Sequence, residues 1–512
     1  MVPDNFFSNI MKIAFANPKK LASSKSLFFA FFQKENVEKE RYFFFLPADT
    51  KRTILQFAKK EFKGEEGEVK SFWLQKGPIT KIALFGLGEK EKWNERKKQL
   101  IPRFFVQYAK SNKISEFSVP ITKVLGQNLA EAAKTFSTNA VLADFEFNKY
   151  KEAPKEGWPK IKTMYLISAE NDAKAMTNGI QEGVIIAKEV NSCRALANTP
   201  GGDMTPRKLA NEAKNTAKGN GINVKILGEK EMQKLGMGGI LGVAKGSLEK
   251  PQLIILEYKK GPKSQKPLVL VGKGVTFDTG GLNLKSEQGI YEMHMDMSGG
   301  ATVIHGISVI ARLKIPINAI GIIPAVENMP SGSSYRPGDM LKTMSGKTIE
   351  VLNTDAEGRI ILADALYFGA KRYKPGLMVD FATLTGAAHV ALGDYCSALF
   401  TNKDELQNEL VKIGEEAGDY VWPLPLWDEY LSDIKGTFGD IANLGKTGRA
   451  GGAIHGAKFL EQFIDNAPWA HIDIAPRMTT AEGEFLAKGA AGAGVRYIVE
   501  LAKEYSQILK KL

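Results

Sequence analysis

The chain contains 512 residues, 44% of them apolar and 25% charged, a composition near the average for soluble globular proteins. A single hydrophobic core rarely serves so long a chain, so we expect two domains. No apolar run approaches the roughly 18–20 residues that span a bilayer, which argues against a membrane protein. The two cysteines, Cys193 and Cys396, are far apart and form no C-x-x-C pattern, which argues against a disulfide framework or a structural zinc finger. With no recognisable secretory signal either, the sequence predicts a cytoplasmic protein.

The net charge of +12 is concentrated in the first third of the chain. Residues 1–170 contain 30 Lys and Arg against 19 Asp and Glu, whereas the remaining residues contain 39 against 38. A basic region of this kind can attract nucleic acid, so a DNA-binding protein is one interpretation. Acidic residues are interspersed among the lysines, however, and no recognised nucleic-acid motif is present. We therefore favour a lysine-rich solvated surface.

The first elements in chain order indicate a small α/β domain. Three aromatic-rich segments predict strands at residues 26–32, 41–46 and 82–86. A helical pattern covers residues 91–110. Strand and helix patterns that alternate in this way are typical of a sheet with helices packed on it.

A stretch rich in Lys, Glu and Pro at residues 149–162 suggests a domain boundary. A strand is predicted at residues 163–168, and a helix that connects the domains at residues 179–198. The predicted division is a basic N-terminal α/β domain at 1–170, a connecting helix at 171–198 and a larger domain at 199–512.

The larger domain alternates apolar strands with helices. Thr205 followed by Pro206 predicts a helix start, because Thr caps a helix and Pro suits its first turn. Strands are predicted at residues 253–257, 268–271, 319–324, 348–352 and 377–381, and helices at 299–313 and 358–373. Strands that are apolar throughout indicate a mixed, mainly parallel central sheet covered by helices on both faces, so the predicted fold class is α/β. In such sheets the chemistry lies in loops at the carboxyl ends of the strands.

Four carboxylates fall in such loops: Asp278, Asp296, Asp355 and Glu357. Taken singly, each also fits a tight turn or a helix cap. Together they would repel one another unless cations neutralise them. Carboxylate oxygens suit divalent ions, zinc included, and two ions bridged by carboxylates are a common device for hydrolysing acyl or phosphoryl bonds.

The five histidines argue against other hydrolase chemistries. None of them lies in an H-E-x-x-H pattern, which argues against a thermolysin-type zinc site. No G-x-S-x-G turn is present to carry a serine nucleophile. A hydrolase built on this chain must therefore use metals bound by carboxylates.

Two motifs make the sequence recognisable. Gly-Lys273-Gly-Val-Thr-Phe-Asp278-Thr-Gly-Gly, followed by Lys285 and Asp296, and Asn-Thr-Asp355-Ala-Glu357-Gly-Arg resemble the leucine (cytosol) aminopeptidase family of two-metal peptidases. The second motif matches the family signature without a substitution. The resemblance extends from about residue 187 to the C-terminus, whereas the first third is recognisable only by position and size.

The resemblance implies a set of site residues. The metal ligands fall on Lys273, Asp278, Asp296, Asp355 and Glu357, with Asp278 and Glu357 bridging the ions. The Lys273 amine must then be neutral, a shift that adjacent dications supply. The catalytic residues fall on Lys285, which stabilises the developing oxyanion, and Arg359, which holds a bicarbonate acting as general base.

The resemblance also implies a substrate and an assembly. The pocket for the N-terminal side chain falls on Met293, Thr383, Leu384, Gly386, Ala475 and Met478. Such an apolar pocket suits leucine or methionine at the end of a peptide or dipeptide, whose free α-amine binds a metal ion and Asp296. The family further implies a homohexamer. It also implies two divalent ions in each subunit, Zn²⁺ or Mn²⁺, with Co²⁺ or Mg²⁺ as alternatives at an exchangeable site. The alternative is a DNA-binding regulatory protein that uses this scaffold through its basic N-terminal domain.

Overall fold

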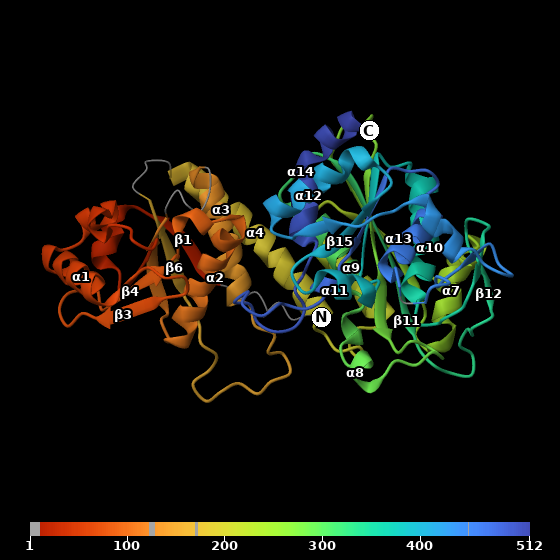
Figure 1. Cartoon of the computed structure of the whole chain (residues 1–512), viewed down its shortest axis with the longest axis horizontal. Coiled ribbons are helices and arrows are strands. Elements are labelled where there is room, and N and C mark those ends of the chain that lie inside the picture. The colour runs from red at the N-terminus through yellow and green to blue at the C-terminus, as the bar shows by residue number, and fades with distance from the viewer. Residues whose placement is uncertain (1–10, 122–127, 169–172, 449) are drawn as a thin grey trace. The chain divides into compact units, whose positions relative to one another are not determined.

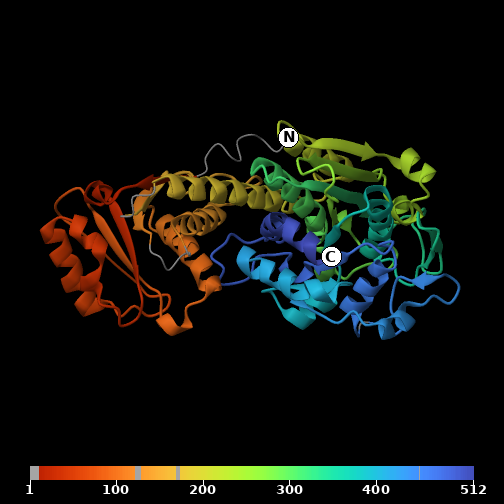
Figure 2. The ribbon, with the colours of Figure 1, turned by 90° about the horizontal axis from the view of Figure 1, so that it is seen from above.

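The computed structural model describes residues 11–121, 128–168, 173–448 and 450–512. The chain divides into two compact units, residues 1–188 with 482–487 and residues 189–481 with 488–512. The change from the first unit to the second falls within one continuous helix, α4 (Ala173–Ala197), which begins six residues earlier than the helix predicted at 179–198 (Figure 2).

The first unit is built on a six-stranded sheet (Figure 1). Its strands lie in the order β1-β6-β5-β2-β4-β3, and only β3 runs antiparallel to its neighbour. The strands are β1 (Lys12–Ala16), β2 (Ser26–Phe31), β3 (Val69–Trp73), β4 (Lys81–Gly86), β5 (Glu116–Pro120) and β6 (Thr163–Ile167), and the main helices are α1 (Ala48–Glu61), α2 (Glu95–Ser111) and α3 (Leu129–Asp144). The small α/β domain predicted from the sequence is confirmed.

Alternating side chains of β2 supply the cores on both faces of this sheet. Phe28 stacks on Phe117 with ring centroids 4.4 Å apart, in the cluster that also contains residues of α2 and α3. Leu27 and Phe29 face the other cluster, which contains Ile54 of α1. Because successive side chains of a strand point to opposite faces, the apolar side chains of β2 are buried in a separate core on each face of the sheet.

The strand predicted at residues 41–46 is wrong, because this segment forms a 3-10 helix, η4 (Arg41–Phe45). The Glu40 side chain accepts a hydrogen bond from the backbone N–H of Tyr42 at 3.0 Å and caps the turn. The neighbours Tyr42 and Phe43 are both buried, while Phe44 is 84% exposed. The backbone N–H groups of Phe43 and Leu46 donate to the carbonyl oxygens three residues earlier, at 3.1 and 3.3 Å, which is the pattern of a 3-10 turn rather than a strand. Aromatic content alone therefore misled the prediction.

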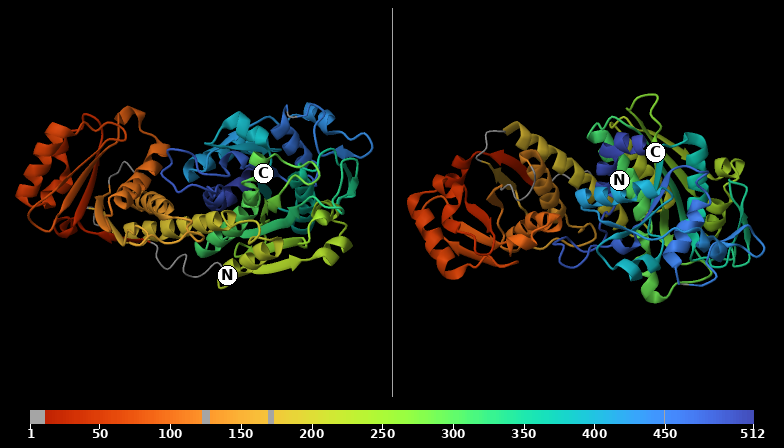
Figure 3. Two further views of the ribbon diagram at one scale, coloured as in Figure 1. Left: turned by 90° about the horizontal axis from the view of Figure 1, so that it is seen from below. Right: turned by 45° about the horizontal axis from the view of Figure 1, so that its top comes forward.

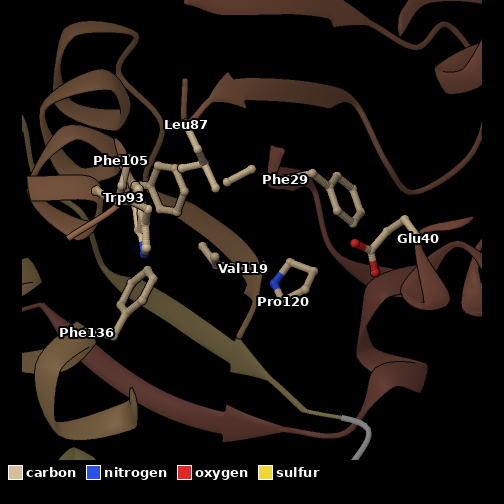
Figure 4. A pocket seen from close by; sticks show the side chains of 10 residues that line it. Phe29, Glu40, Leu87, Trp93, Phe105, Val119, Pro120 and Phe136 are labelled. Atoms are coloured by element: carbon tan, nitrogen blue, oxygen red, sulfur yellow. The ribbon is translucent and has the colours of Figure 1, made fainter. Parts of the chain in front are cut away.

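A narrow pocket lies at the carboxyl ends of β2 and β5 (Figure 4). Its lining is Phe29, Ala30, Glu40, Leu87, Trp93, Ile101, Phe105, Val119, Pro120 and Phe136. Glu40 is the one carboxylate in this lining, and burial raises its pKa above the ordinary value. The predicted metal ligands, from Lys273 to Glu357, all belong to the second unit.

The second unit contains a nine-stranded sheet in the order β16-β15-β18-β14-β9-β11-β8-β7, with β10 paired to β11. The strands are β7 (Asn223–Leu227), β8 (Gln252–Lys259), β9 (Leu268–Gly272), β10 (Gly274–Asp278), β11 (Asn318–Asn328), β14 (Leu377–Ala382), β15 (Ser397–Thr401), β16 (Val421–Pro423) and β18 (Trp469–Asp473). The central strands β11, β9, β14 and β18 run parallel, while β7, β8 and β15 form antiparallel pairs. The predicted mixed, mainly parallel sheet is therefore confirmed.

Helices cover both faces of this sheet (Figures 1 and 3). The helices α9 (Ser298–Arg312), α12 (Asp404–Ala417) and α14 (Val495–Lys511) pack on one side, and α7 (Gly238–Val243), α10 (Glu357–Tyr373) and α13 (Gly452–Glu461) on the other. Helix α5 (Pro206–Ala217) begins where the sequence predicted, with the Thr205 hydroxyl accepting from the backbone N–H of Lys208.

One predicted strand of this unit lies elsewhere. Residues 348–352 contribute β13 (Thr348–Glu350), which pairs with β12 (Met340–Lys342) and β17 (Ile441–Ala442) in a separate three-stranded sheet. The local pattern predicted an extended segment correctly, but pairing is set by distant residues that the pattern does not contain. This small sheet leads the chain into the start of α10.

The parallel strands β10, β14 and β18 end at the same edge of the sheet, since each is joined to the others through parallel neighbours. Their last residues are Asp278, Ala382 and Asp473. Loops that follow these strands are therefore brought together, although nearly 200 residues separate them in the chain.

Asp419 fixes the start of α14 in this unit. Its Oδ2 accepts from the backbone N–H groups of Gly494, Arg496 and Tyr497 at 3.0, 3.2 and 3.3 Å, and its Oδ1 lies 2.8 Å from the Arg496 guanidinium. We expect Asp419→Ala to lower the free energy of unfolding by about 1–2 kcal/mol, because backbone donors at the helix start lose their acceptor. Urea unfolding followed by circular dichroism measures this loss.

The matched control is Glu416→Ala, which removes a carboxylate that pairs with Lys412 at 3.6 Å on the helix surface. That change should alter the free energy of unfolding by less than about 0.5 kcal/mol. Equal losses in the two variants would contradict the role given to Asp419.

Candidate active site

The predicted site residues come from four places at this edge of the sheet. Lys273 follows β9, Asp278 ends β10, Asp296 follows the 3-10 turn η8 (Met293–Met295), and Glu357 is the first residue of α10. Asp355 lies in the loop just before α10. The structure thus gathers residues that are up to 84 positions apart.

Lys273 lies at the centre of the first group of contacts. Its Nζ is 2.8 Å from Asp296, 2.8 Å from Oε1 of Glu357 and 2.9 Å from the carbonyl oxygen of Thr383. Lys273 is only 3% exposed. Burial alone lowers the pKa of the amine, but the carboxylates of Asp296, Glu357 and Asp278 outweigh it and raise the pKa above its ordinary value.

Lys285 joins the second pair of carboxylates. Its Nζ lies 2.9 Å from Oδ2 of Asp278 and 2.5 Å from Oδ1 of Asp355. The side chains of Lys285 and Asp355 are 17% and 35% exposed, whereas Asp278 is buried. This side of the cluster is therefore the one that a substrate can reach from solvent.

The carboxylates themselves meet the requirements of a metal site. Oxygen atoms of Asp278, Asp355 and Glu357 all lie within 4.8 Å of one another. The second oxygen of Glu357, Oε2, is buried and has no hydrogen-bond partner among the described residues. Burial raises the pKa of Asp296 to about 8, although the Lys273 ammonium opposes the shift. Buried oxygens that lack donors, packed this closely, fit divalent cations.

Close backbone approach holds Lys273 against α10. A Cβ atom at Gly358 would lie 2.5 Å from Cε and 2.8 Å from Nζ of Lys273. The amine has no room to move away without leaving Asp296, Glu357 and Thr383. A side chain at the position after Glu357 would therefore displace the Lys273 amine from these contacts.

A set of uncharged residues supports the carboxylates, and the sequence did not reveal it. Asn328, at the end of β11, donates from Nδ2 to Oδ1 of Asp278 at 2.8 Å and to the carbonyl oxygen of Thr354 at 2.9 Å. The Thr354 carbonyl also accepts from the Tyr335 hydroxyl at 2.7 Å. The strand register brings Asn328 next to Asp278, since the two residues are paired across β10 and β11. No local sequence pattern carries that information.

Arg359 is buried in the first turn of α10. It donates from Nη1 to the carbonyl oxygen of Asn443 at 3.0 Å, while its Nε has no hydrogen-bond partner in the described part of the chain. Burial lowers the pKa of its guanidinium to about 10, against the opposing effect of Glu357 and Asp473. A buried cation with a spare donor is suited to hold an anion.

Asn443 connects this arginine to the loop of Asp355. Its Oδ1 accepts from the backbone N–H groups of Leu352 and Asn353 at 2.8 and 3.3 Å, and its Nδ2 donates to the carbonyl oxygen of Asn353 at 2.6 Å. The sequence analysis missed Asn443, since a lone asparagine about 90 residues away carries no local signal.

The predicted pocket residues gather beside the cluster. Thr383 and Leu384 follow β14, Gly386 begins α11 (Gly386–Leu392), Ala475 begins the 3-10 turn η10 (Ala475–Arg477), Met478 follows it, and Met293 lies in η8. Since β14 pairs with β18 and α11 packs on η10, five of the six positions come from two adjacent strand ends. Met293, Leu384, Ala475 and Met478 are half-buried, as the walls of a binding site would be.

Comparison with known proteins identifies this arrangement. The catalytic-domain model of the cytosol aminopeptidase family matches residues 191–499, and the model of the N-terminal domain of the same family matches residues 31–154. The chain belongs to the cytosol aminopeptidase family. The family resemblance predicted from the two motifs is confirmed, and the first third, recognisable before only by position, belongs to the same family.

Relatives and solved structures agree with this assignment. A probable cytosol aminopeptidase of Methylobacillus flagellatus is 41% identical over 83% of this chain and 85% of its own length, and one of Rickettsia africae is 38% identical over 88% and 90%. A mutant tomato leucine aminopeptidase superposes with a TM-score of 0.86 at 29% identity, over 97% of both chains. The bottromycin maturation enzyme BotP in complex with Mn superposes with a TM-score of 0.81 at 27% identity, over 94% of this chain and 100% of its own.

Membership of this family makes the chain a metal-dependent aminopeptidase, a hydrolase that acts on peptides. The alternative of a DNA-binding regulatory protein gains no support from these relatives. The helices in the described part of the chain are all too short or too polar to span a lipid bilayer.

The close approach of α10 to Lys273 can be tested with Gly358→Ala. Alanine favours a helix, so we expect the protein to stay folded while the new methyl group displaces the amine. The affinity for Mn²⁺ should fall by roughly 10–100-fold, the usual cost of disturbing the support of a metal site. Isothermal titration calorimetry measures this affinity.

Gly332→Ala is the control, because a Cβ atom at Gly332 has nothing within 4 Å. It should leave Mn²⁺ binding unchanged. An unaltered affinity in folded Gly358→Ala would show that Lys273 is not held in place by this contact.

Proposed function

We propose that this aminopeptidase removes an N-terminal leucine, methionine or other apolar residue from peptides and dipeptides, using two divalent metal ions. One observation carries the proposal. The carboxylate oxygens of Asp278, Asp355 and Glu357 lie within 4.8 Å of one another, with Lys273 and Lys285 in contact with this group at the carboxyl edge of the sheet.

Five side chains would hold the ions: Lys273, Asp278, Asp296, Asp355 and Glu357. Their oxygen-rich donor set, completed by one amine, suits Zn²⁺ or Mn²⁺, and Co²⁺ or Mg²⁺ at the more exposed position next to Asp355. When bound, the two metal ions would supply an activated water molecule and polarise the carbonyl group of the substrate. Mn in the related enzyme BotP is consistent with this choice.

We propose that Lys285 acts on the substrate. It is the charged donor of the cluster that remains partly exposed, and Asp278 and Asp355 fix its ammonium group by direct contacts. A preorganised donor of this kind stabilises the negative charge that develops on the scissile carbonyl oxygen.

Arg359 is proposed to hold a bicarbonate ion, which would supply the general base. The buried guanidinium is fixed by Asn443 and keeps the Nε donor for an anion. Removal of a proton from the attacking water then needs no side chain at this position.

Substrate orientation follows from the surroundings of Asp296. This buried carboxylate accepts from the Thr383 hydroxyl at 2.7 Å and lies three residues after Met293, beside the predicted pocket. A free α-amine bound there places the first side chain against Met293, Leu384, Ala475 and Met478 and the first peptide bond near Lys285. Cleavage is thereby limited to the N-terminal residue. The homohexamer and the cytoplasmic location remain predictions from the resemblance.

Hydrolysis of leucine p-nitroanilide tests the proposal. The wild type should lose activity after chelation and regain it with Mn²⁺ or Zn²⁺. Lys285→Ala, verified as folded by circular dichroism, should lose at least about 10²-fold in kcat, the usual cost of removing one transition-state donor. Asp355→Ala, verified in the same way, should lose a similar factor because it removes a proposed metal ligand.

Lys511→Ala and Glu409→Ala are matched controls, since they remove a lysine and a carboxylate that pair at 2.7 Å on the surface of the same unit. Both should retain full activity. Absence of turnover with every metal, on leucyl peptides as well as on the chromogenic substrate, would refute the proposed reaction.

A further inference from the structure

Asp473 is a buried carboxylate that the proposed reaction does not use. It ends β18 and is 0% exposed. Its Oδ1 accepts from the backbone N–H groups of Leu384 and Ala475 at 3.0 and 3.1 Å, and its Oδ2 accepts from the Thr385 hydroxyl at 2.7 Å. One side chain therefore holds donors from two different loops.

These two loops are the walls of the proposed pocket. Leu384 and Thr385 belong to the loop between β14 and α11, and Ala475 begins η10. Thr385 also caps α11, because its hydroxyl oxygen accepts from the backbone N–H of Ala388 at 3.1 Å. Since α11 packs against η10, the Asp473 carboxylate sets the spacing between both walls. Hydrogen bonds to an ionised, buried acceptor are strong enough to do so.

The loop after β14 has a second, separate anchor. The carbonyl oxygen of Thr383 accepts from Lys273 and its hydroxyl donates to Asp296. The loop is thus fixed to the metal cluster through Thr383 and to β18 through Leu384 and Thr385. Loss of the second anchor leaves the ligands of the first in place.

We propose that Asp473 is a positioning residue that sets the selectivity for the N-terminal side chain by holding Leu384 and Ala475 at the separation that fits a leucine-sized group. The inference rests on the proposed function, because it assigns these two loops to the pocket. Asp473 acts on the substrate only through the loops that it holds. A role in folding alone would instead affect all substrates alike.

The test compares kcat/KM for leucine and alanine p-nitroanilides in Asp473→Ala and Asp473→Asn. In Asp473→Ala the preference for leucine should fall at least about 10-fold, because a pocket whose walls have moved no longer encloses the larger group. In Asp473→Asn the amide oxygen still accepts from both N–H groups, and the Thr385 hydroxyl can turn to accept from the amide. The preference should then stay within about threefold of the wild type.

The Asn variant also removes a negative charge close to His471 and Arg359. Any effect of that charge on the reaction acts on both substrates, so it changes the two kcat/KM values together and leaves their ratio unaltered. The affinity for Mn²⁺, measured by calorimetry, should stay within about threefold of the wild type in both variants, as the anchor through Thr383 remains.

Asp364→Ala is the matched control for lost stability. Asp364 is an equally buried carboxylate whose oxygens accept from the backbone N–H groups of Gly239, Ile240 and Met344 at 2.8, 3.0 and 2.8 Å. Its hydrogen bonds go to segments outside the two pocket loops. Asp364→Ala should lower the melting temperature as Asp473→Ala does, yet keep the leucine preference.

An unchanged leucine preference in folded Asp473→Ala, or an equal fall in Asp364→Ala, overturns the proposal. If Asp473→Ala does not fold, Asp473→Ser replaces it, because its shorter side chain cannot reach the backbone N–H groups of both loops. An unchanged leucine preference in folded Asp473→Ser overturns the proposal, and a fall of at least about 10-fold supports it. Calorimetric affinities for free L-leucine and L-alanine give the ratio without turnover. The two proposals can fail separately. If the wild type binds leucine selectively but hydrolyses no substrate, and Asp473→Ala binds leucine without selectivity, the role of Asp473 in the pocket is supported and the peptidase reaction is refuted.

Discussion

Mutual repulsion among four carboxylates is the constraint that shapes this molecule. Asp278, Asp296 and Glu357 are buried, and Asp355 joins them from a half-exposed loop. Negative charges packed this closely destabilise one another unless cations and fixed donors offset the repulsion. The carboxylates come from three separate places, the end of β10, the end of η8 and the start of α10. The energy that holds them together therefore comes from the packing of the sheet and of helices α9 and α10. A large apolar core beneath the edge is therefore a condition for the chemistry above it.

Buried polar side chains transmit the order of the sheet to these loops. Asn328, Asn443 and Asp473 each end or follow a strand, and each is bonded to backbone groups of a segment far away in the chain. Loops carry backbone donors and acceptors that a strand ladder no longer satisfies. The three side chains form hydrogen bonds with these backbone groups and thereby hold the loops in place. Such supporting contacts determine how accurately the ligands are held.

The residues that carry chemistry could be predicted because they are local in sequence. Asp355 and Glu357 lie in one short motif, and Lys273 and Asp278 in another, each at the end of an apolar strand that the composition reveals. Residues that act by tertiary register could not be predicted, since Asn328 meets Asp278 only through the pairing of β10 and β11. The strand predicted at residues 41–46 failed for a related reason, as aromatic content favours a strand while the Glu40 side chain caps a 3-10 turn that begins at the next residue. Residues within short motifs could be predicted from the sequence, whereas contacts that depend on strand pairing could not.

Chemistry and selectivity are anchored to different strands of the same sheet. Thr383 is bound to Lys273 and Asp296, while its neighbours Leu384 and Thr385 are bound to Asp473 on β18. A single peptide unit therefore separates a segment that serves the ligands from one that shapes the pocket. Changes on the β18 side can move the pocket wall without removing any bond to the carboxylate cluster. A fold with this division can keep one reaction and vary its substrates, because the two functions depend on different hydrogen bonds.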